Sequence, residues 1–245
     1  MKKVLIAASV GVLTVLSSCD VLESAASTVS NSSSTGKIPL SNEEVVKGLK
    51  EALSVGITNS VNLTSVADGF LKNSEIRLPF PPDAIKVREK AIEWGLDGQV
   101  EKFETTLNRA AEEAAKEALP IFKNAITGMS LQDGFTVLNG GKGAATKFLK
   151  DNTTNELIAA FAPKVKTAIE KVKLTDYWNP IVTKYNTAAP LLGTNKVNPD
   201  LNEYVTQLAI DGLFKMVEKE ENKIRDNASA RVSDLLQRVF GSLDK

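Results

Sequence analysis

Three glycines and a lysine lie together at residues 138–149, whose sequence is LNGGKGAATKFL. A glycine-rich turn that carries a lysine and leads into an apolar run is typical of phosphate-binding loops, in which backbone N–H groups surround the anion. A P-loop also requires a preceding strand and a glycine where Thr136 stands, and neither is present in this sequence. We therefore expect a turn between two helices. The alternative is an anion site formed by Gly141, Lys142 and Gly143.

A second group of residues capable of chemistry lies near the C-terminus: Glu221, Arg225, Arg231 and Asp234. Glu221 and Arg225 are four positions apart, in the order that favours a surface ion pair on a helix. The two arginines flank a turn at 226–227 and could instead hold an acid from another helix, because guanidinium groups favour bidentate partners. We expect a structural ion-pair cluster that fixes the last helix, with an anion-binding site as the alternative.

Composition limits the chemistry that the other residues can perform. The 245 residues include no histidine, one cysteine, and 30 basic and 30 acidic side chains. Histidine-dependent catalysis and zinc hydrolysis are therefore excluded, no metal or cofactor is expected, and no charge excess favours nucleic acid. Glu112, Glu113 and Glu117 belong to an alanine-rich helix and are interpreted as its solvated face. Only chemistry by a pair of carboxylates stays possible, and no catalytic residue is assigned.

The single cysteine, Cys19, follows a short targeting segment. Lys2 and Lys3 precede an apolar core at 4–15, and the following Leu-Ser-Ser-Cys sequence at 16–19 resembles a bacterial lipobox. This pattern predicts removal of residues 1–18 as a signal peptide and modification of Cys19 with acyl chains such as palmitate. The mature lipoprotein should then be anchored to a membrane of the bacterial cell envelope, facing the periplasm. An ordinary secretory signal is the alternative, and the choice between inner and outer membrane is left open.

Residues 19–40 are expected to form a lipidated, flexible tether. Nine of the twelve residues from Ser24 to Thr35 are Ser, Thr or Asn. Such a stretch buries too little apolar surface to offset the entropy of ordering, and about 20 flexible residues reach roughly 25 Å. Residues 41–245 are then long enough to form one folded domain.

Helical signals fill residues 41–245. Apolar residues recur at intervals of three and four, and no stretch alternates for long enough to predict a sheet. Helix starts are expected at capping boxes, in which Ser or Thr precedes an acid by three positions: Ser41–Glu44, Ser130–Asp133 and Thr153–Glu156. The predicted fold class is all-α, a single compact domain of eight or nine helices.

Individual residues predict several boundaries between these helices. The stretch IRLPFPP at 76–82 contains three prolines and should be extended, with a short helix before it at 66–72. The longest helix should begin with Asp97 as its cap and should end or kink at Pro120. Gly140 is expected to end a helix in the left-handed conformation.

Four segments, in order along the chain, resemble a known family: SNEEVVKGLKEAL, IRLPFP, GGKGAATKFLKDNT with FAPKV after it, and LNEYVTQLAIDGLFKMVEKEENKIRDNASARVSDLLQRVFG. They span roughly residues 41–241, and the chain is identified as a member of domain of unknown function 4197, a family of bacterial envelope proteins. The pattern departs at Ala228, where a proline is expected. The resemblance implies an all-helical domain behind a lipoprotein or secretory signal. It implies no established activity and no catalytic residues.

Together these features predict a membrane-anchored envelope lipoprotein that is not an enzyme. We expect a binding or assembly module for an unknown protein or small-molecule partner. One alternative is a carboxylate-dependent hydrolase of cell-wall material, which would need two acids facing each other in a cleft. Another is a carrier of a small hydrophobic ligand, which would need an apolar cavity.

Overall fold

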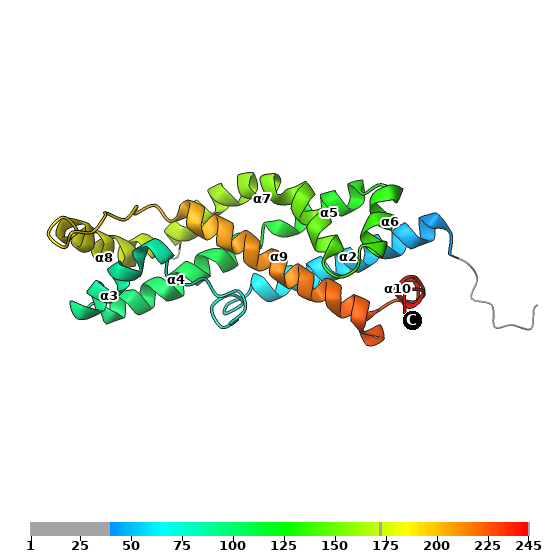
Figure 1. Cartoon of the computed structure of the whole chain (residues 1–245), viewed down its shortest axis with the longest axis horizontal. Helices are drawn as coiled ribbons and strands as arrows, with labels where there is room; N and C mark the ends of the chain where they lie inside the picture. Colours follow the sequence, from blue (N-terminus) through cyan, green and yellow to red (C-terminus); the bar gives the residue numbers. More distant parts are fainter. Residues whose placement is uncertain (1–39, 172, 245) are drawn as a thin grey trace, which may run out of the picture. The chain divides into compact units, whose positions relative to one another are not determined.

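The computed structural model describes residues 40–171 and 173–244. The chain divides into two units, residues 1–39 and residues 40–245, and the predicted signal peptide, Cys19 and most of the tether lie outside the described residues. Nine α-helices and no strand occur in the described part of the second unit, so the predicted all-α class is confirmed (Figure 1). None of the helices in these ranges is both long enough and apolar enough to cross a membrane.

The helices differ widely in length, from 8 to 28 residues. In chain order they are α2 (Asn42–Thr64), α3 (Ile85–Glu93), α4 (Asp97–Ala115), α5 (Ala118–Gly128), α6 (Leu131–Asn139), α7 (Ala144–Lys171), α8 (Leu174–Ala188), α9 (Asn202–Asp226) and α10 (Asp234–Gly241). Two 3-10 turns lie at Pro82–Ala84 and Ala228–Ala230.

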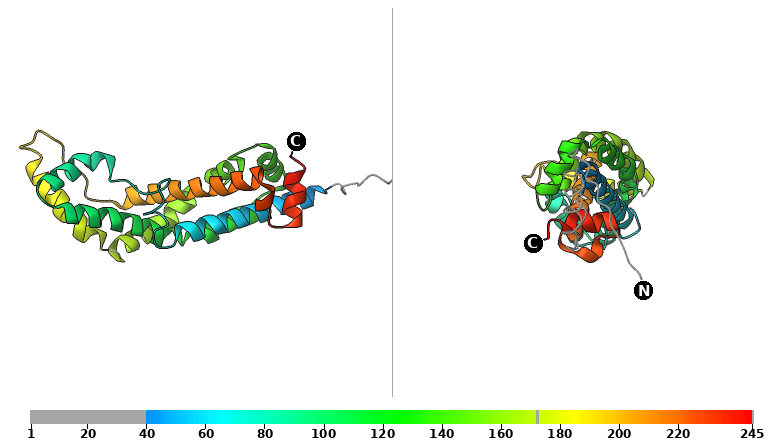
Figure 2. Two further views of the ribbon diagram at one scale, coloured as in Figure 1. Left: turned by 90° about the horizontal axis from the view of Figure 1, so that it is seen from below. Right: turned by 90° about the vertical axis from the view of Figure 1, so that its right-hand side faces the viewer.

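Helix α9 is central to the packing of residues 40–244. It packs against α7, α2 and α4, while α4 packs in turn against α7 and α8. Figure 2 shows α9, in orange, running alongside α2, in blue. The interior between the helices is apolar, and its largest fully buried side chains include Trp178, Phe70, Phe103, Phe122 and Phe161. Each such side chain stabilises the fold by about 1.5–3 kcal/mol, so apolar burial is the main force that holds the helices together.

Two glycines allow other helices to approach α2 closely. A Cβ atom added at Gly134 of α6 would lie 2.6 Å from Cγ2 of Val46. One added at Gly48 of α2 would lie 2.7 Å from Cγ2 of Val239 in α10. These separations are shorter than carbon atoms tolerate, so the absence of a side chain determines how near α6 and α10 lie to α2.

Two of the predicted capping boxes are confirmed. The hydroxyl of Ser41 accepts from the N–H of Glu44, and the Glu44 carboxylate accepts in return from the N–H of Ser41. Ser130 and Asp133 form the same pair of bonds at the start of α6. The predicted extended stretch 76–82 is also non-helical through Pro81, because proline lacks the N–H that a helix requires.

The predicted helix start at Thr153–Glu156 is wrong. Both residues lie inside α7, where Thr153 is buried and its hydroxyl donates to the carbonyl oxygen of Leu149 at 2.7 Å. A Thr hydroxyl can accept from an N–H group at the start of a helix, or it can donate to the carbonyl oxygen four residues earlier inside a helix. The Thr-x-x-Glu pattern alone therefore does not decide whether a helix begins at that threonine. At 28 residues α7 is also longer than α4, which has 19 and was expected to be the longest helix.

Of three smaller boundary predictions, two differ from the structure. Leu96, and not Asp97, is the N-cap of α4, and Asp97 instead places its charge in the first turn, where the helix dipole favours it. Residues 66–72 form turns instead of a helix, with Asp68 at φ 70°. The predicted interruption at Pro120 is confirmed: α4 ends at Ala115 and Pro120 lies in the first turn of α5, because the proline ring is incompatible with a helix continuing across the preceding turn.

Candidate functional site

The glycine turn that resembles a phosphate loop joins α6 to α7. Gly140 has φ −74°, so the predicted left-handed cap at this position is wrong. The left-handed residues are Gly141, with φ 77°, and Gly143, with φ 74°. Glycine adopts this conformation without steric cost, which lets the chain reverse between the two helices. Nζ of Lys142, between them, lies 2.5 Å from the carboxylate of Asp226, and both side chains are exposed.

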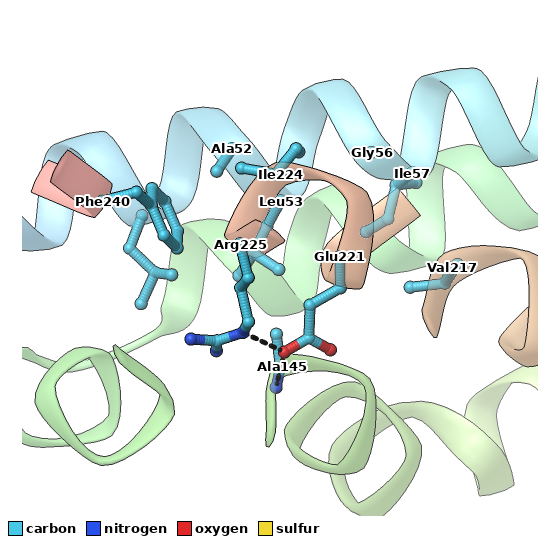
Figure 3. A pocket seen from close by; sticks show the side chains of 11 residues that line it. Ala52, Leu53, Gly56, Ile57, Ala145, Val217, Glu221, Ile224, Arg225 and Phe240 are labelled. Atoms are coloured by element: carbon cyan, nitrogen blue, oxygen red, sulfur yellow. Dashed lines mark hydrogen bonds and ion pairs between the residues drawn. The ribbon is translucent and has the colours of Figure 1, made fainter. Parts of the chain in front are cut away.

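The N-terminus of α7 at this turn does hold an anion, and the anion is Glu221 of α9 (Figure 3). Its carboxylate accepts from the N–H of Ala145 at 3.0 Å, and from the N–H and hydroxyl of Thr146 at 2.9 and 2.8 Å. The unpaired N–H groups and the dipole of a helix N-terminus favour a negative charge. The chain thus supplies its own carboxylate where a phosphate loop would hold a phosphate.

Arg225 connects this carboxylate to the end of α6. Its Nε donates to Glu221 at 2.9 Å, and its two terminal nitrogens donate to the carbonyl oxygens of Leu138 and Val137 at 3.1 and 2.8 Å. The pair lies in the interior and not on the surface, because the side chains of Arg225 and Glu221 are only 8% and 5% exposed. One helix, α9, therefore stabilises both the end of α6 and the start of α7.

Arg231 extends this arrangement to the end of α9. It donates to the carbonyl oxygens of Ile224 at 3.1 Å and Arg225 at 2.9 Å, and its ion-pair partner is Asp244, at 2.6 Å. Hydrogen bonds from Arg231 to Asp244 raise the pKa of the Arg231 guanidinium. Asp234 is exposed at the start of α10 and forms no ion pair within the described residues. The structure thus brings three of the four predicted cluster residues together.

A second buried carboxylate, Glu112 of α4, repeats the pattern of Glu221. It accepts from the N–H groups of Phe70 and Leu71 at 3.1 and 3.2 Å and pairs with Arg109 at 2.7 Å. The expectation that Glu112 belongs to a solvated face is wrong, because the residue is only 4% exposed. Glu112 satisfies backbone N–H groups in the turns after α2, which helix hydrogen bonds cannot do.

A surface hollow of about 370 Å³ lies where α8 and the start of α9 meet two non-helical segments, residues 77–81 as its first wall and residues 194–201 as its second. This volume is within the range of about 300–1,000 Å³ that is typical of ligand sites. Its apolar lining residues are Pro81, Trp178, Val197, Leu201, Tyr204 and Leu208. Sequence reasoning missed this hollow, although two proline-containing extended segments near aromatic residues were a usable signal.

Both extended walls of the hollow are held by amide side chains. Asn108 of α4 accepts from the N–H of Leu78 at 2.8 Å and donates to the carbonyl oxygen of the same residue at 3.1 Å. Asn186 of α8 does the same for Val197, with both bonds at 2.9 Å. In a β-sheet, a neighbouring strand would bond the backbone N–H and carbonyl groups of such a segment. Here the side-chain amide of one asparagine bonds both groups of one residue instead.

The floor of the hollow, at Trp178, rests on a buried aromatic stack. The Trp178 ring stacks on Phe103 with centroids 4.6 Å apart and meets Phe80 edge-on at 5.7 Å. The indole Nε1 donates to the carbonyl oxygen of Pro199 at 2.9 Å, so this floor is also bonded to the second extended wall. Offset and edge-on ring contacts add about 0.5–1.5 kcal/mol each beyond burial, which makes the floor rigid.

Tyr204 of α9 completes the lining and joins α9 to the first wall. Its hydroxyl donates to the carbonyl oxygen of Pro79 at 2.9 Å. Burial raises the pKa of Tyr204 to about 12. The hydroxyl therefore stays protonated near neutral pH and keeps its role as a hydrogen-bond donor.

The fold and these sites define an all-helical domain in which buried carboxylates cap turns and helix ends, beside a preformed surface hollow. The family model described as Protein of unknown function (DUF4197) matches residues 39–241, so the chain belongs to this family. No curated protein and no solved structure matches the chain. The assignment agrees with the resemblance in the sequence and adds no activity to it.

Proposed function

We propose that this protein is a non-catalytic binding or assembly module of the bacterial cell envelope, anchored to a membrane through lipid on Cys19. The role of the buried carboxylates supports the non-catalytic part. Glu112 and Glu221 each accept two backbone N–H groups and pair with one arginine. A general acid or base must reach a proton of its substrate, whereas these carboxylates are occupied by the fold.

The anchoring part of the proposal rests on the sequence. Leu16 and two serines precede Cys19 after a short apolar core, as in lipobox signals. Two acyl chains are enough for stable attachment where one is marginal. The Ser-rich residues between Cys19 and the helical domain would then hold the domain near the membrane, facing the periplasm.

The hollow supports a binding role. Its walls are bonded to Asn108 and Asn186, and its floor rests on a buried aromatic stack. A surface that is already ordered loses little conformational entropy when a partner docks, so more of the contact energy appears as affinity.

The carrier alternative receives less support. The apolar cavity between α2 and α9, lined in part by Ala52, Gly56 and Ile57, measures about 20 Å³ (Figure 3). That is room for about one water molecule and is far below the volume of a typical ligand site.

The anchor is tested by Cys19→Ala, which is expected to move the protein from the membrane fraction to the soluble fraction. Ser18→Ala is the matched control, because it keeps both the cysteine and a small residue before it, and it should stay in the membrane. Cys19→Ala protein that resists extraction from membranes by carbonate would refute the anchor.

Binding is tested by native mass spectrometry of the full chain, purified in detergent from its own host. A retained protein or ligand is the expected result. Turnover of isolated cell-wall material by the same preparation would contradict the non-catalytic assignment.

A further inference from the structure

We propose that the hollow lined by Pro81, Trp178, Val197 and Tyr204 docks a cationic peptide segment of a partner protein. The segment would present lysine or arginine side chains, with their aliphatic stems against the apolar lining. This inference rests on the proposed binding function and names the chemistry of the partner.

The charge of the hollow carries the argument. Its two charged lining residues are Asp200 and Glu203, and neither forms an ion pair with any residue that the structure describes. An adjoining hollow of about 290 Å³ shares Asp200 and adds Glu170 and Lys166. The two linings together contain three carboxylates and one lysine. Lys196 belongs to the same loop but lines neither hollow, so the surface keeps an excess of negative charge.

The uncharged part of the lining selects for a cation on an apolar stem. Tyr204 and Leu208 are half-buried and provide aromatic and aliphatic surface beside the acids, while Trp178 and Leu201 are buried beneath them. Lysine and arginine bury their methylene stems on such surface while their charged ends reach outward, and aromatic rings attract cations. An acidic segment would be repelled, and a wholly apolar one would desolvate the carboxylates without giving them a partner.

Asp200 and Glu203 also stabilise the N-terminus of α9, and this structural role is distinct from the proposed docking role. Asp200 accepts from the N–H of Asn202 at 2.9 Å, and Glu203 lies in the first turn of the helix. Negative charge stabilises a helix N-terminus. The second oxygen of Asp200 and both oxygens of Glu203, however, form no hydrogen bond within the described residues. These oxygens are free to receive a cation.

The test uses the full-length protein in detergent micelles. The probe is a blocked lysine-leucine-lysine tripeptide, and its binding is measured by isothermal titration calorimetry. We expect saturable binding, and we expect Asp200→Asn combined with Glu203→Gln to weaken it at least about tenfold. Asparagine at 200 keeps an oxygen for the helix bond, so this pair removes charge with little change in shape.

The matched control is Glu43→Gln combined with Asp234→Asn, which removes two acids from the first turns of α2 and α10. It changes the net charge equally and should alter the affinity less than about twofold. A blocked glutamate-leucine-glutamate tripeptide should not bind.

Three results would overturn the docking assignment: equal weakening by the control pair, tighter binding of the acidic tripeptide, or no saturable binding up to about 1 mM. If binding is absent while native mass spectrometry still detects a retained partner, the docking assignment fails and the proposed binding function stands. If neither is found, both fail.

Discussion

Replacing Glu221 with glutamine removes the one negative charge that the start of α7 and Arg225 share. The carboxylate accepts three hydrogen bonds from Ala145 and Thr146 and lies 2.9 Å from Nε of Arg225. The Glu221 side chain is 5% exposed, so water cannot reach the site to solvate the Arg225 charge that the substitution leaves without a partner. Glutamine has nearly the same shape, and the substitution therefore tests charge with little change in packing.

Two contributions set the size of the expected loss. Removing one partner of a buried ion pair costs about 3–5 kcal/mol, because the remaining charge is left without compensation. Losing a negative charge at a partly buried helix N-terminus costs up to about 2 kcal/mol. Both contributions come from the same carboxylate and overlap, and the glutamine oxygen keeps part of the hydrogen bonding. We therefore expect Glu221→Gln to lower the free energy of unfolding by about 3–4 kcal/mol.

Urea unfolding followed by circular dichroism measures this free energy directly. Glu218→Gln is the matched control, because Glu218 lies about one turn earlier on α9 and is exposed. Its effect should stay within about 0.5 kcal/mol. A loss below about 1 kcal/mol for Glu221→Gln, or a loss equal to that of the control, would refute the conclusion that Glu221 stabilises the α6–α7 turn.

Two further predictions concern α6. Gly134→Ala should lower the free energy of unfolding by about 1–3 kcal/mol, because the added Cβ would lie 2.6 Å from Val46. Urea unfolding checks this against Gly98→Ala, whose Cβ meets nothing within 4 Å, and equal effects would contradict it. Hydrogen bonds from the hydroxyl and N–H of Ser130 hold the pKa of Asp133 below its usual value of 3.8. The stability that Asp133 contributes is therefore present above pH 3.8, and it is lost as the pH falls through the lower pKa of the folded state. Asp133→Asn should flatten the decrease in melting temperature below about pH 4, and a profile parallel to that of the wild type would count against this.

Local patterns predicted the fold class and several helix boundaries. The boxes at Ser41 and Ser130 formed because each places its acid and hydroxyl within one turn. The box at Thr153 did not form because α7 begins earlier, at Ala144. That start is stabilised by Glu221, which lies 76 positions after Ala145 in the chain. No window of a few residues contains this information.

The sequence marks the two proline-containing segments of the hollow, but it does not show which residues hold them in place, for the same reason. Its first wall is held by a residue of α4 that is 30 positions away, and the Tyr204 hydroxyl reaches across 125 positions to Pro79. Asn108 and Tyr204 are ordinary helix residues until α4 and α9 are placed beside the extended segments. Whether Asp200 forms an ion pair likewise depends on which lysines the fold brings near its carboxylate.

The sequence by itself determined that the chain is helical, where the prolines interrupt it, which family it belongs to, and that histidine chemistry is unavailable. These properties depend on composition, on residues within a few positions of one another, or, for the family, on short segments in a fixed order along the chain. Only the tertiary structure decided that the anion at the glycine turn is the protein's own Glu221, and that Glu112 and Arg231 are buried. The partner of a buried charge depends on which helices pack together, because burial makes an unpaired charge too costly to keep. The turn at 138–149 therefore resembles a phosphate loop in sequence and serves as a capped joint between α6 and α7.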